Sequence, residues 1–118
     1  MLADLAILSH ITMRTLKENP TLADIQEYVG VLERELGFDK TTTNLQSALQ
    51  LGEEVGELFK AIRKAEKMRV AGDAKIGSID EELADILIFI SAIANRYSID
   101  LEKALRNKEE INKKREWK

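Results

Sequence analysis

Cysteine is absent from this chain of 118 residues, and histidine occurs once, at His10. Without cysteine the chain can form neither a disulfide bond nor a thiolate metal site. With one histidine it also lacks a histidine-cluster metal site and the Glu-x-x-His pattern that binds two iron ions in helical bundles. Any metal site must therefore rely on oxygen ligands, above all on carboxylates.

Proline and glycine are scarce as well, with one proline and six glycines. No segment alternates apolar and polar residues as a half-buried strand does, and no hairpin turn signal stands out. We therefore predict an all-α fold, a small antiparallel bundle of four to five helices in a single domain. This length supports a small core, to which oligomerisation would add burial.

Signals for export and for membrane insertion are missing too. The first residues carry Asp4 before any cationic side chain, unlike the basic start of a signal peptide. The apolar run from Ile86 to Ala94 is too short to span a bilayer. The net charge of −3 argues against a nucleic acid polymer as partner, because phosphate backbones usually bind a basic face. We expect a cytoplasmic protein that binds neither membranes nor nucleic acid polymers.

Capping signals and apolar periodicity define the expected helices. Thr21 with Asp24 and Ser78 with Glu81 have the spacing of capping boxes, and Asp100 is suited to cap a helix. The expected helices cover residues 2–17, 22–37, 43–69, 78–97 and 101–115, with a loop at 38–43.

Two carboxylate pairs are the most informative feature of the sequence. Glu54 and Glu57 lie in the third expected helix, and Glu82 and Asp85 lie in the fourth. A spacing of three places both members of a pair on one side of a helix, about 60° apart. If the two helices lie side by side and antiparallel, four carboxylates can converge on one point. Such a cluster requires a cation, and Mg²⁺ or Mn²⁺ suits a site built from oxygen ligands.

The spacing alone leaves a second interpretation open. Glu54 and Glu57 lie off the apolar face of the third helix, where nearby lysines and arginines can neutralise them as on an ordinary solvated surface. That apolar face consists of Leu45, Ala48, Leu49, Val55, Leu58, Phe59 and Ile62. On the fourth helix the dipole accounts well for Glu82 but poorly for Asp85, which lies further into an almost wholly apolar helix. Burying Asp85 without a partner would be costly, so this position favours a bound cation.

A family resemblance rests on three strings, GEEVGELFKAIRK, EELADILIFISAIANRYSIDLEKAL and NKEEINKKR. Together they resemble the MazG-like nucleotide pyrophosphohydrolases of the all-α NTP pyrophosphatase superfamily. The resemblance covers residues 21–118, which we expect to form a MazG-like pyrophosphohydrolase domain. Residues 1–20 have no clear counterpart, and we expect them to form an additional N-terminal helix used for packing or oligomerisation.

The resemblance implies roles for individual residues. The family's Mg²⁺ ligands correspond to Glu54, Glu57, Glu82 and Asp85, and Mn²⁺ is the expected substitute ion. Its substrate contacts correspond to Phe89, Lys108, Asn112, Lys113 and Arg115. Glu53 and Glu81 adjoin the ligand positions, where they can bind a second ion or orient water. Relatives build the substrate site partly from a neighbouring subunit, which implies a homodimer or homotetramer.

The residues also suit hydrolysis of a nucleoside triphosphate. A triphosphate adds negative charge to a carboxylate-rich site, so divalent ions must bridge the two. Glu53 or Glu54 can act as general base, and Lys108 and Arg115 offer donors to phosphate oxygens. Because the chain has no cysteine and no plausible Ser–His pair, direct attack by water is simpler than a covalent intermediate. We predict an Mg²⁺-dependent enzyme that converts a (d)NTP and water into a (d)NMP and pyrophosphate, with house-cleaning of aberrant nucleotides as one role.

Other functions stay open at the level of the sequence. A phosphoribosyl-ATP pyrophosphohydrolase shares the fold and cleaves the same kind of bond. A non-catalytic helical module that binds nucleotides or partner helices would show no turnover. Without the resemblance, Lys108, Asn112 and Arg115 would be read as a solvated basic end of the chain. The polar residues from Thr41 to Asn44 fit either helix capping or a wall of the nucleotide pocket.

Overall fold

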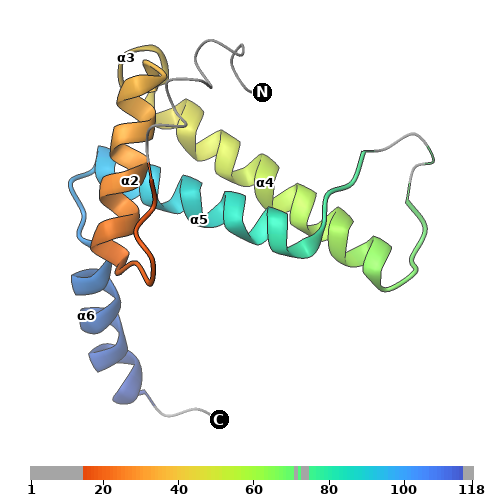
Figure 1. Ribbon diagram of the computed structural model, residues 1–118. Coiled ribbons are helices and arrows are strands. Elements are labelled where there is room, and N and C mark those ends of the chain that lie inside the picture. The colour runs from red at the N-terminus through yellow and green to blue at the C-terminus, as the bar shows by residue number, and fades with distance from the viewer. Residues whose placement is uncertain (1–14, 71, 73–74, 116–118) are drawn as a thin grey trace.

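The computed structural model describes residues 15–70, 72 and 75–115, and in these residues the secondary structure is entirely helical. The helices are α2 (Leu22–Glu35), α3 (Phe38–Thr41), α4 (Asn44–Ala65), α5 (Ile79–Arg96) and α6 (Leu101–Lys113). Figure 1 shows α4 and α5 running side by side in opposite directions, with α2 crossing one end of the pair. The prediction of an all-α fold is confirmed. Within the described residues, no helix is long and apolar enough to cross a membrane.

The start of α2 is held by the capping box that the sequence predicts. The Thr21 hydroxyl accepts a hydrogen bond from the backbone N–H of Asp24 at 3.0 Å, and the Asp24 carboxylate accepts one from the Thr21 N–H at 2.9 Å. The hydrogen bond from the Thr21 N–H holds the pKa of Asp24 below its usual value, because it favours the charged carboxylate. The Ser78 and Asp100 side chains cap α5 and α6 by accepting from the backbone N–H groups of Glu81 and Lys103. At Ser78 this bond, at 3.4 Å, is one of the two that make up the predicted capping box.

Helix α4 ends four residues earlier than the sequence predicts. It was expected to reach Arg69, but it ends at Ala65 because Lys67 adopts a left-handed conformation with φ of 59°. The N–H of Met68 then bonds to the carbonyl of Arg63, and the N–H of Lys67 bonds to that of Lys64. This pattern closes a helix by satisfying its last carbonyls. The loop from residue 66 to Ser78 therefore begins close to the end of the paired helices.

The two long helices bury small residues. On α4, Ser47 and Ala61 are buried and share a row, at intervals of seven residues, with the half-buried Glu54. On α5, Ser91, Ala92 and Ala94 are buried. Small side chains at a helix contact allow close approach of the two axes. Glu54, which the sequence places off the apolar face of this helix, thus lies on the row that α4 directs toward the interior.

The larger apolar side chains of α4 remain exposed in the single chain. Leu45, Leu49 and Phe59 are exposed to 69%, 61% and 59%, and Leu83 on α5 is exposed to 51%. The apolar face that the sequence indicates on the third helix is therefore largely uncovered in the described residues. Each of the two helices carries an apolar stripe that no other part of the described residues covers. The stripes consist of Leu45, Leu49, Phe59 and Ile62 on α4 and of Leu83, Leu87 and Ile90 on α5.

A pair of amides joins α2, α5 and α6. The Gln26 amide donates to the Asn95 side chain at 3.1 Å and to the carbonyl of Ile99 at 2.8 Å, and Asn95 donates back to the Gln26 carbonyl at 2.8 Å. The Gln26 side-chain oxygen accepts from the N–H of Leu101 at 2.9 Å, at the first residue of α6. These bonds fix where α6 leaves the body of the molecule.

Arg96 ties the segment between α2 and α4 to the end of α5. Its guanidinium donates to the carbonyls of Thr42 at 2.6 Å and Phe38 at 2.9 Å, and it pairs with Glu33 at 3.1 Å. Both side chains of the ion pair are almost fully buried. The loop expected at 38–43 contains the short helix α3, whose carbonyls face this guanidinium.

The helix predicted at residues 2–17 falls mostly outside the described residues. Thr15, Leu16 and Lys17 are described and are not helical, so the predicted end of that helix at Lys17 is wrong. The division into an additional helix at 1–20 and a domain at 21–118 stays a prediction.

Candidate active site

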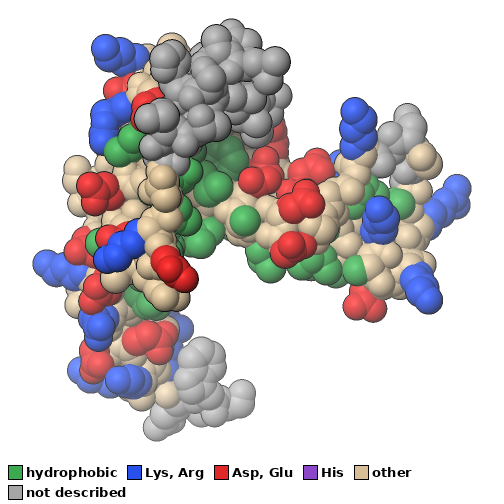
Figure 2. All heavy atoms as spheres, in the orientation of Figure 1, with side chains coloured by type: hydrophobic (Ala, Val, Ile, Leu, Met, Phe, Trp, Pro, Cys, Tyr) green, Lys and Arg blue, Asp and Glu red, His purple; other side chains and the backbone are tan. Residues whose placement is uncertain are grey.

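The antiparallel pairing of α4 and α5 brings carboxylates from both helices together. Within the described part of the chain, Glu54, Glu82 and Asp85 each offer one carboxylate oxygen, and these oxygens lie within 4.8 Å of one another. Glu82 is buried at 8% exposure, and Glu54 and Asp85 are half-buried. Figure 2 shows acidic side chains grouped in the middle of the arm formed by α4 and α5. Three of the four predicted metal ligands therefore meet at one place, which we call the carboxylate cluster.

Crowding changes the acidity of Glu54. Burial, together with the charges of the neighbouring Asp85 and Glu82, raises the pKa of Glu54 to about 7, because both effects disfavour a further negative charge at this place. A hydrogen bond from Glu54 to Glu82 also stabilises the protonated form. Near neutral pH this carboxyl is therefore divided between its charged and neutral forms.

Glu57 lies outside the carboxylate cluster. Its carboxylate is 3.4 Å from the Nζ of Lys60, and its side chain is 38% exposed. It is still close enough for its charge to raise the pKa of Glu54. An exposed pair of this kind contributes little free energy, so it holds Glu57 in place only weakly.

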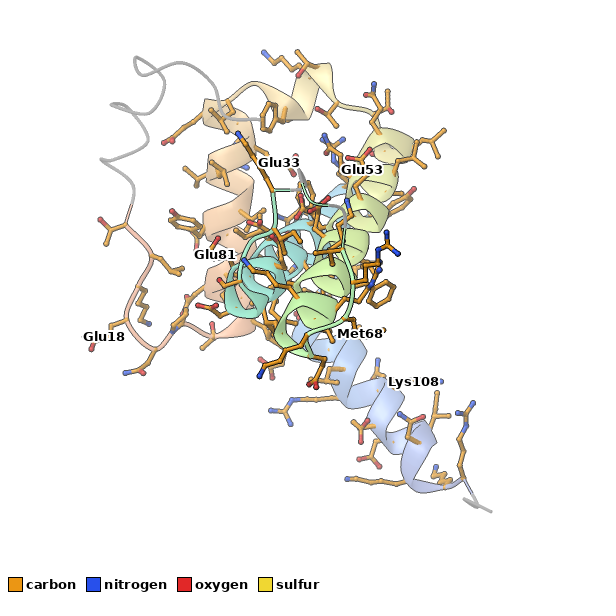
Figure 3. The ribbon with its side chains drawn as sticks, turned by 90° about the vertical axis from the view of Figure 1, so that its right-hand side faces the viewer. Glu18, Glu33, Glu53, Met68, Glu81 and Lys108 are labelled. Atoms are coloured by element: carbon orange, nitrogen blue, oxygen red, sulfur yellow. The ribbon has the colours of Figure 1, made fainter. Side chains whose placement is uncertain are left out.

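Glu53 and Glu81 border the carboxylate cluster in the sequence, and both are exposed. Figure 3 labels them, Glu53 on α4 and Glu81 in the first turn of α5. Both carboxylates are therefore open to solvent.

The carboxylate cluster suits a divalent cation. Three carboxylates supply oxygen donors and a formal charge of about −3, which is the donor chemistry that Mg²⁺ and Mn²⁺ prefer. Two oxygens on opposite sides of Mg²⁺ lie about 4.2 Å apart, at about 2.1 Å from the ion. The cluster oxygens lie within 4.8 Å of one another, a limit that exceeds this distance by a fraction of an ångström. The residues therefore fit such an ion after a small inward movement of their side chains.

Comparison with known proteins identifies the family. The family model described as the MazG nucleotide pyrophosphohydrolase domain matches residues 42–117, which include α4, α5 and α6. The chain belongs to the MazG family. The match contains all three members of the carboxylate cluster.

Two individual relatives agree with this assignment. The MazG chain is 31% identical over 106 residues to dCTP pyrophosphatase 1 of Rattus norvegicus, an alignment that covers 81% of this chain. It spans 59% of the length of that relative. A crystal structure of iMazG from Vibrio DAT 722 superimposes with a TM-score of 0.55 at 33% identity, covering 80% of this chain and 99% of the other. The MazG-like helical fold is therefore shown for this protein.

The predicted substrate contacts on the last helix lie apart from the carboxylate cluster in the single MazG chain. Figures 1 and 3 show α6, with Lys108, extending away from the end of α5 opposite to its first turn. Lys108, Lys113 and Arg115 are exposed. Asn112 donates to Glu109 at 3.1 Å, and Lys113 pairs with Glu110 at 3.2 Å. These residues do not complete the site within one chain.

Phe89 lies closer to the cluster, on α5. It follows Asp85 by four residues, so it lies on the same side of α5 one turn further along, and it is half-buried.

A polar cavity of about 370 Å³ lies around Arg96, at the other end of α5 from the carboxylate cluster. It is lined by Gly30, Glu33, Arg34, Asp39, Asn44, Asn95 and Arg96. The sequence pointed to Asn44 as a wall of the nucleotide pocket or as part of a helix start. The structure places Asn44 directly after the Thr43 cap, at the first residue of α4, and in the lining of this cavity. Its role as a wall of the nucleotide pocket stays a prediction. The Glu33–Arg96 pair was not found from the sequence, because 63 residues separate its members and no local spacing relates them.

Proposed function

We propose that this chain is a divalent-cation-dependent nucleoside triphosphate pyrophosphohydrolase, which converts a (d)NTP and water into a (d)NMP and pyrophosphate. The convergence of Glu54, Glu82 and Asp85 from two helices carries the proposal, since such a cluster needs a cation and lies inside the MazG match. The rat relative is a dCTP pyrophosphatase by name, which supports a nucleotide of this class as the substrate. Removal of aberrant nucleotides is the role that we propose for the reaction.

In this proposal Glu54, Glu82 and Asp85 hold Mg²⁺, for which Mn²⁺ can substitute. Glu57 is the fourth candidate ligand, because its exposed contact with Lys60 is weak enough to open. When bound, the ion offsets the charge of the triphosphate and polarises its phosphoryl oxygens. The carboxylates orient the ion between the two helices.

The proposed reaction is attack by water at the α-phosphorus. A bond forms between the water oxygen and the α-phosphorus, and the bond from that phosphorus to the bridging oxygen breaks. Pyrophosphate leaves with the electron pair of the broken bond, and the proton of the water passes to a carboxylate. Glu53 and Glu54 are the candidates for this general base, since one is exposed beside the cluster and the other has a pKa of about 7.

A second copy of the chain is the proposed partner. The apolar stripes of α4 and α5 would be covered in a homodimer or homotetramer, which would remove large exposed leucine and phenylalanine side chains from water. Since α6 points away from the cluster of its own chain, we propose that it reaches the cluster of a neighbouring subunit. Phe89 would then pack near the base. Lys108, Asn112 and Lys113 of α6 would contact phosphate and sugar together with Arg115, which follows the end of the helix.

The test is product analysis across a panel of substrates. Purified protein is incubated with each NTP and dNTP and with phosphoribosyl-ATP, in Mg²⁺ or in EDTA, and products are identified by ³¹P NMR. The proposal predicts nucleoside monophosphate and pyrophosphate, formed from one or more triphosphates in Mg²⁺ and not in EDTA. Turnover confined to phosphoribosyl-ATP would show the neighbouring activity instead. No turnover with any substrate, in Mn²⁺ as well, would leave a binding module as the function.

A further inference from the structure

Gly77 lies directly against the carboxylate of Glu82. It ends the loop between α4 and α5, one residue before the Ser78 cap. A Cβ atom built on Gly77 would lie 2.4 Å from the Oε1 of Glu82, and 3.4 Å from both the Cδ of Glu82 and an oxygen of Glu81. A Cβ atom essentially never approaches another heavy atom within 3.0 Å. A side chain at position 77 and the observed position of the Glu82 carboxylate therefore exclude each other.

Backbone conformation does not explain this glycine. Among the described glycines, Gly37 has a positive φ, at 75°, and Gly77 does not. The φ of Gly77 therefore lies on the side that an alanine also adopts. Position 77 must lack a side chain, because the Glu82 carboxylate occupies the space that a side chain would fill.

We infer that Gly77 is a positioning residue for the cation site, since its bare backbone lets the Glu82 carboxylate fold back beside Glu54 and Asp85. This inference rests on the proposed function. An ordinary contact begins at 3.4 Å, so alanine at 77 would displace Oε1 by about 1.0 Å, the difference from 2.4 Å. Ligand positions in metal sites tolerate deviations of about 0.2 Å. The displacement would therefore take Glu82 out of range of an ion that Glu54 and Asp85 also hold.

Folding should tolerate the same change. The atom that Cβ would meet is the end of the flexible Glu82 side chain, which can rotate away without moving the backbone. Replacing glycine by alanine also lowers the conformational entropy of the unfolded chain, which favours the folded state. The substitution should therefore weaken cation binding and leave thermal stability unchanged. A purely structural role for Gly77 would instead lower thermal stability.

The experiment compares Gly77→Ala with Gly72→Ala. Gly72 belongs to the same loop, and a Cβ there would meet no atom of the described residues within 4 Å. Binding of Mn²⁺ is measured by isothermal titration calorimetry, and Tm is measured in EDTA. Gly77→Ala should weaken Mn²⁺ binding by about 10- to 100-fold, the usual effect of disturbing the groups that orient metal ligands. Gly72→Ala should bind as wild type does, and both variants should keep the wild-type Tm in EDTA.

A double variant tests the cause of the loss. In Gly77→Ala/Glu82→Asp the carboxylate is one methylene shorter, so it should fit beside alanine and bind Mn²⁺ more tightly than Gly77→Ala does. Unchanged binding by Gly77→Ala, a large loss of Tm in EDTA, or purely additive losses in the double variant would each overturn the inference. If wild type itself binds no Mn²⁺, the proposed cation site fails, and the inference fails with it.

Discussion

Protonation of Glu54 should compete with cation binding, so the affinity for Mn²⁺ should depend on pH in a calculable way. Burial and the neighbouring carboxylates raise the pKa of Glu54 to about 7 in the metal-free protein. An ion binds the charged form, and its binding therefore releases a proton below that pH. With a pKa of about 7, the Kd for Mn²⁺ should be about tenfold weaker at pH 6 than at its plateau above pH 8, and about twofold weaker at pH 7.

The assay is isothermal titration calorimetry with Mn²⁺ from pH 5.5 to pH 8.5 at constant ionic strength. Repeating the titration in buffers of different ionisation enthalpy counts the protons released. Glu54→Gln should bind more weakly at every pH but should lose most of the slope between pH 6 and pH 8. Glu66→Gln removes an exposed carboxylate at the end of the same helix and should keep the wild-type slope. A flat affinity for wild type between pH 6 and pH 8 would refute the reasoning.

Three further results are expected. The pKa of Glu54 in the folded state is raised from 4.5 to about 7, so its contribution to stability is present at low pH and is lost as the pH rises through about 7. The Tm of wild type in EDTA should therefore fall between about pH 4.5 and pH 7, and that of Glu54→Gln should fall less. Arg96→Met should leave Glu33 buried without its partner and lower the free energy of urea unfolding by about 3 kcal/mol, whereas a loss below about 1 kcal/mol would contradict the buried pair. Leu49→Lys should shift the sedimentation coefficient toward that of the monomer without lowering helicity, and an unchanged coefficient would show that this stripe is not an interface.

The fold class and three members of the cluster could be predicted because their signals are local. Capping at Thr21 depends on a partner three residues away, and the spacing of Glu82 and Asp85 places them on one side of a helix. To bring carboxylates of the two helices together, the prediction needed one assumption, that α4 and α5 lie side by side and antiparallel. The structure shows this arrangement.

Other features could not be predicted because they depend on which face of a helix is covered. The apolar periodicity of α4 groups Leu49 and Phe59 on one face but does not say what covers that face. In the structure α4 buries Ser47 and Ala61 and leaves the larger side chains exposed. The small residues Ser47 and Ala61, which share a row with Glu54, were the available signal for this contact. The close approach of Gly77 to Glu82 needs three-dimensional positions, because a glycine near a helix start has many ordinary explanations.

The central claim is that the carboxylate cluster holds the ion on which hydrolysis depends. The most direct measurement is the rate of pyrophosphate release in Mg²⁺, for wild type, Asp85→Asn and Glu66→Gln in parallel, on the triphosphate that wild type hydrolyses fastest. Asp85→Asn keeps the size of the side chain but removes one charge from the cluster. We predict a loss of at least about 100-fold for Asp85→Asn and a wild-type rate for Glu66→Gln. Equal rates for all three proteins would contradict the account.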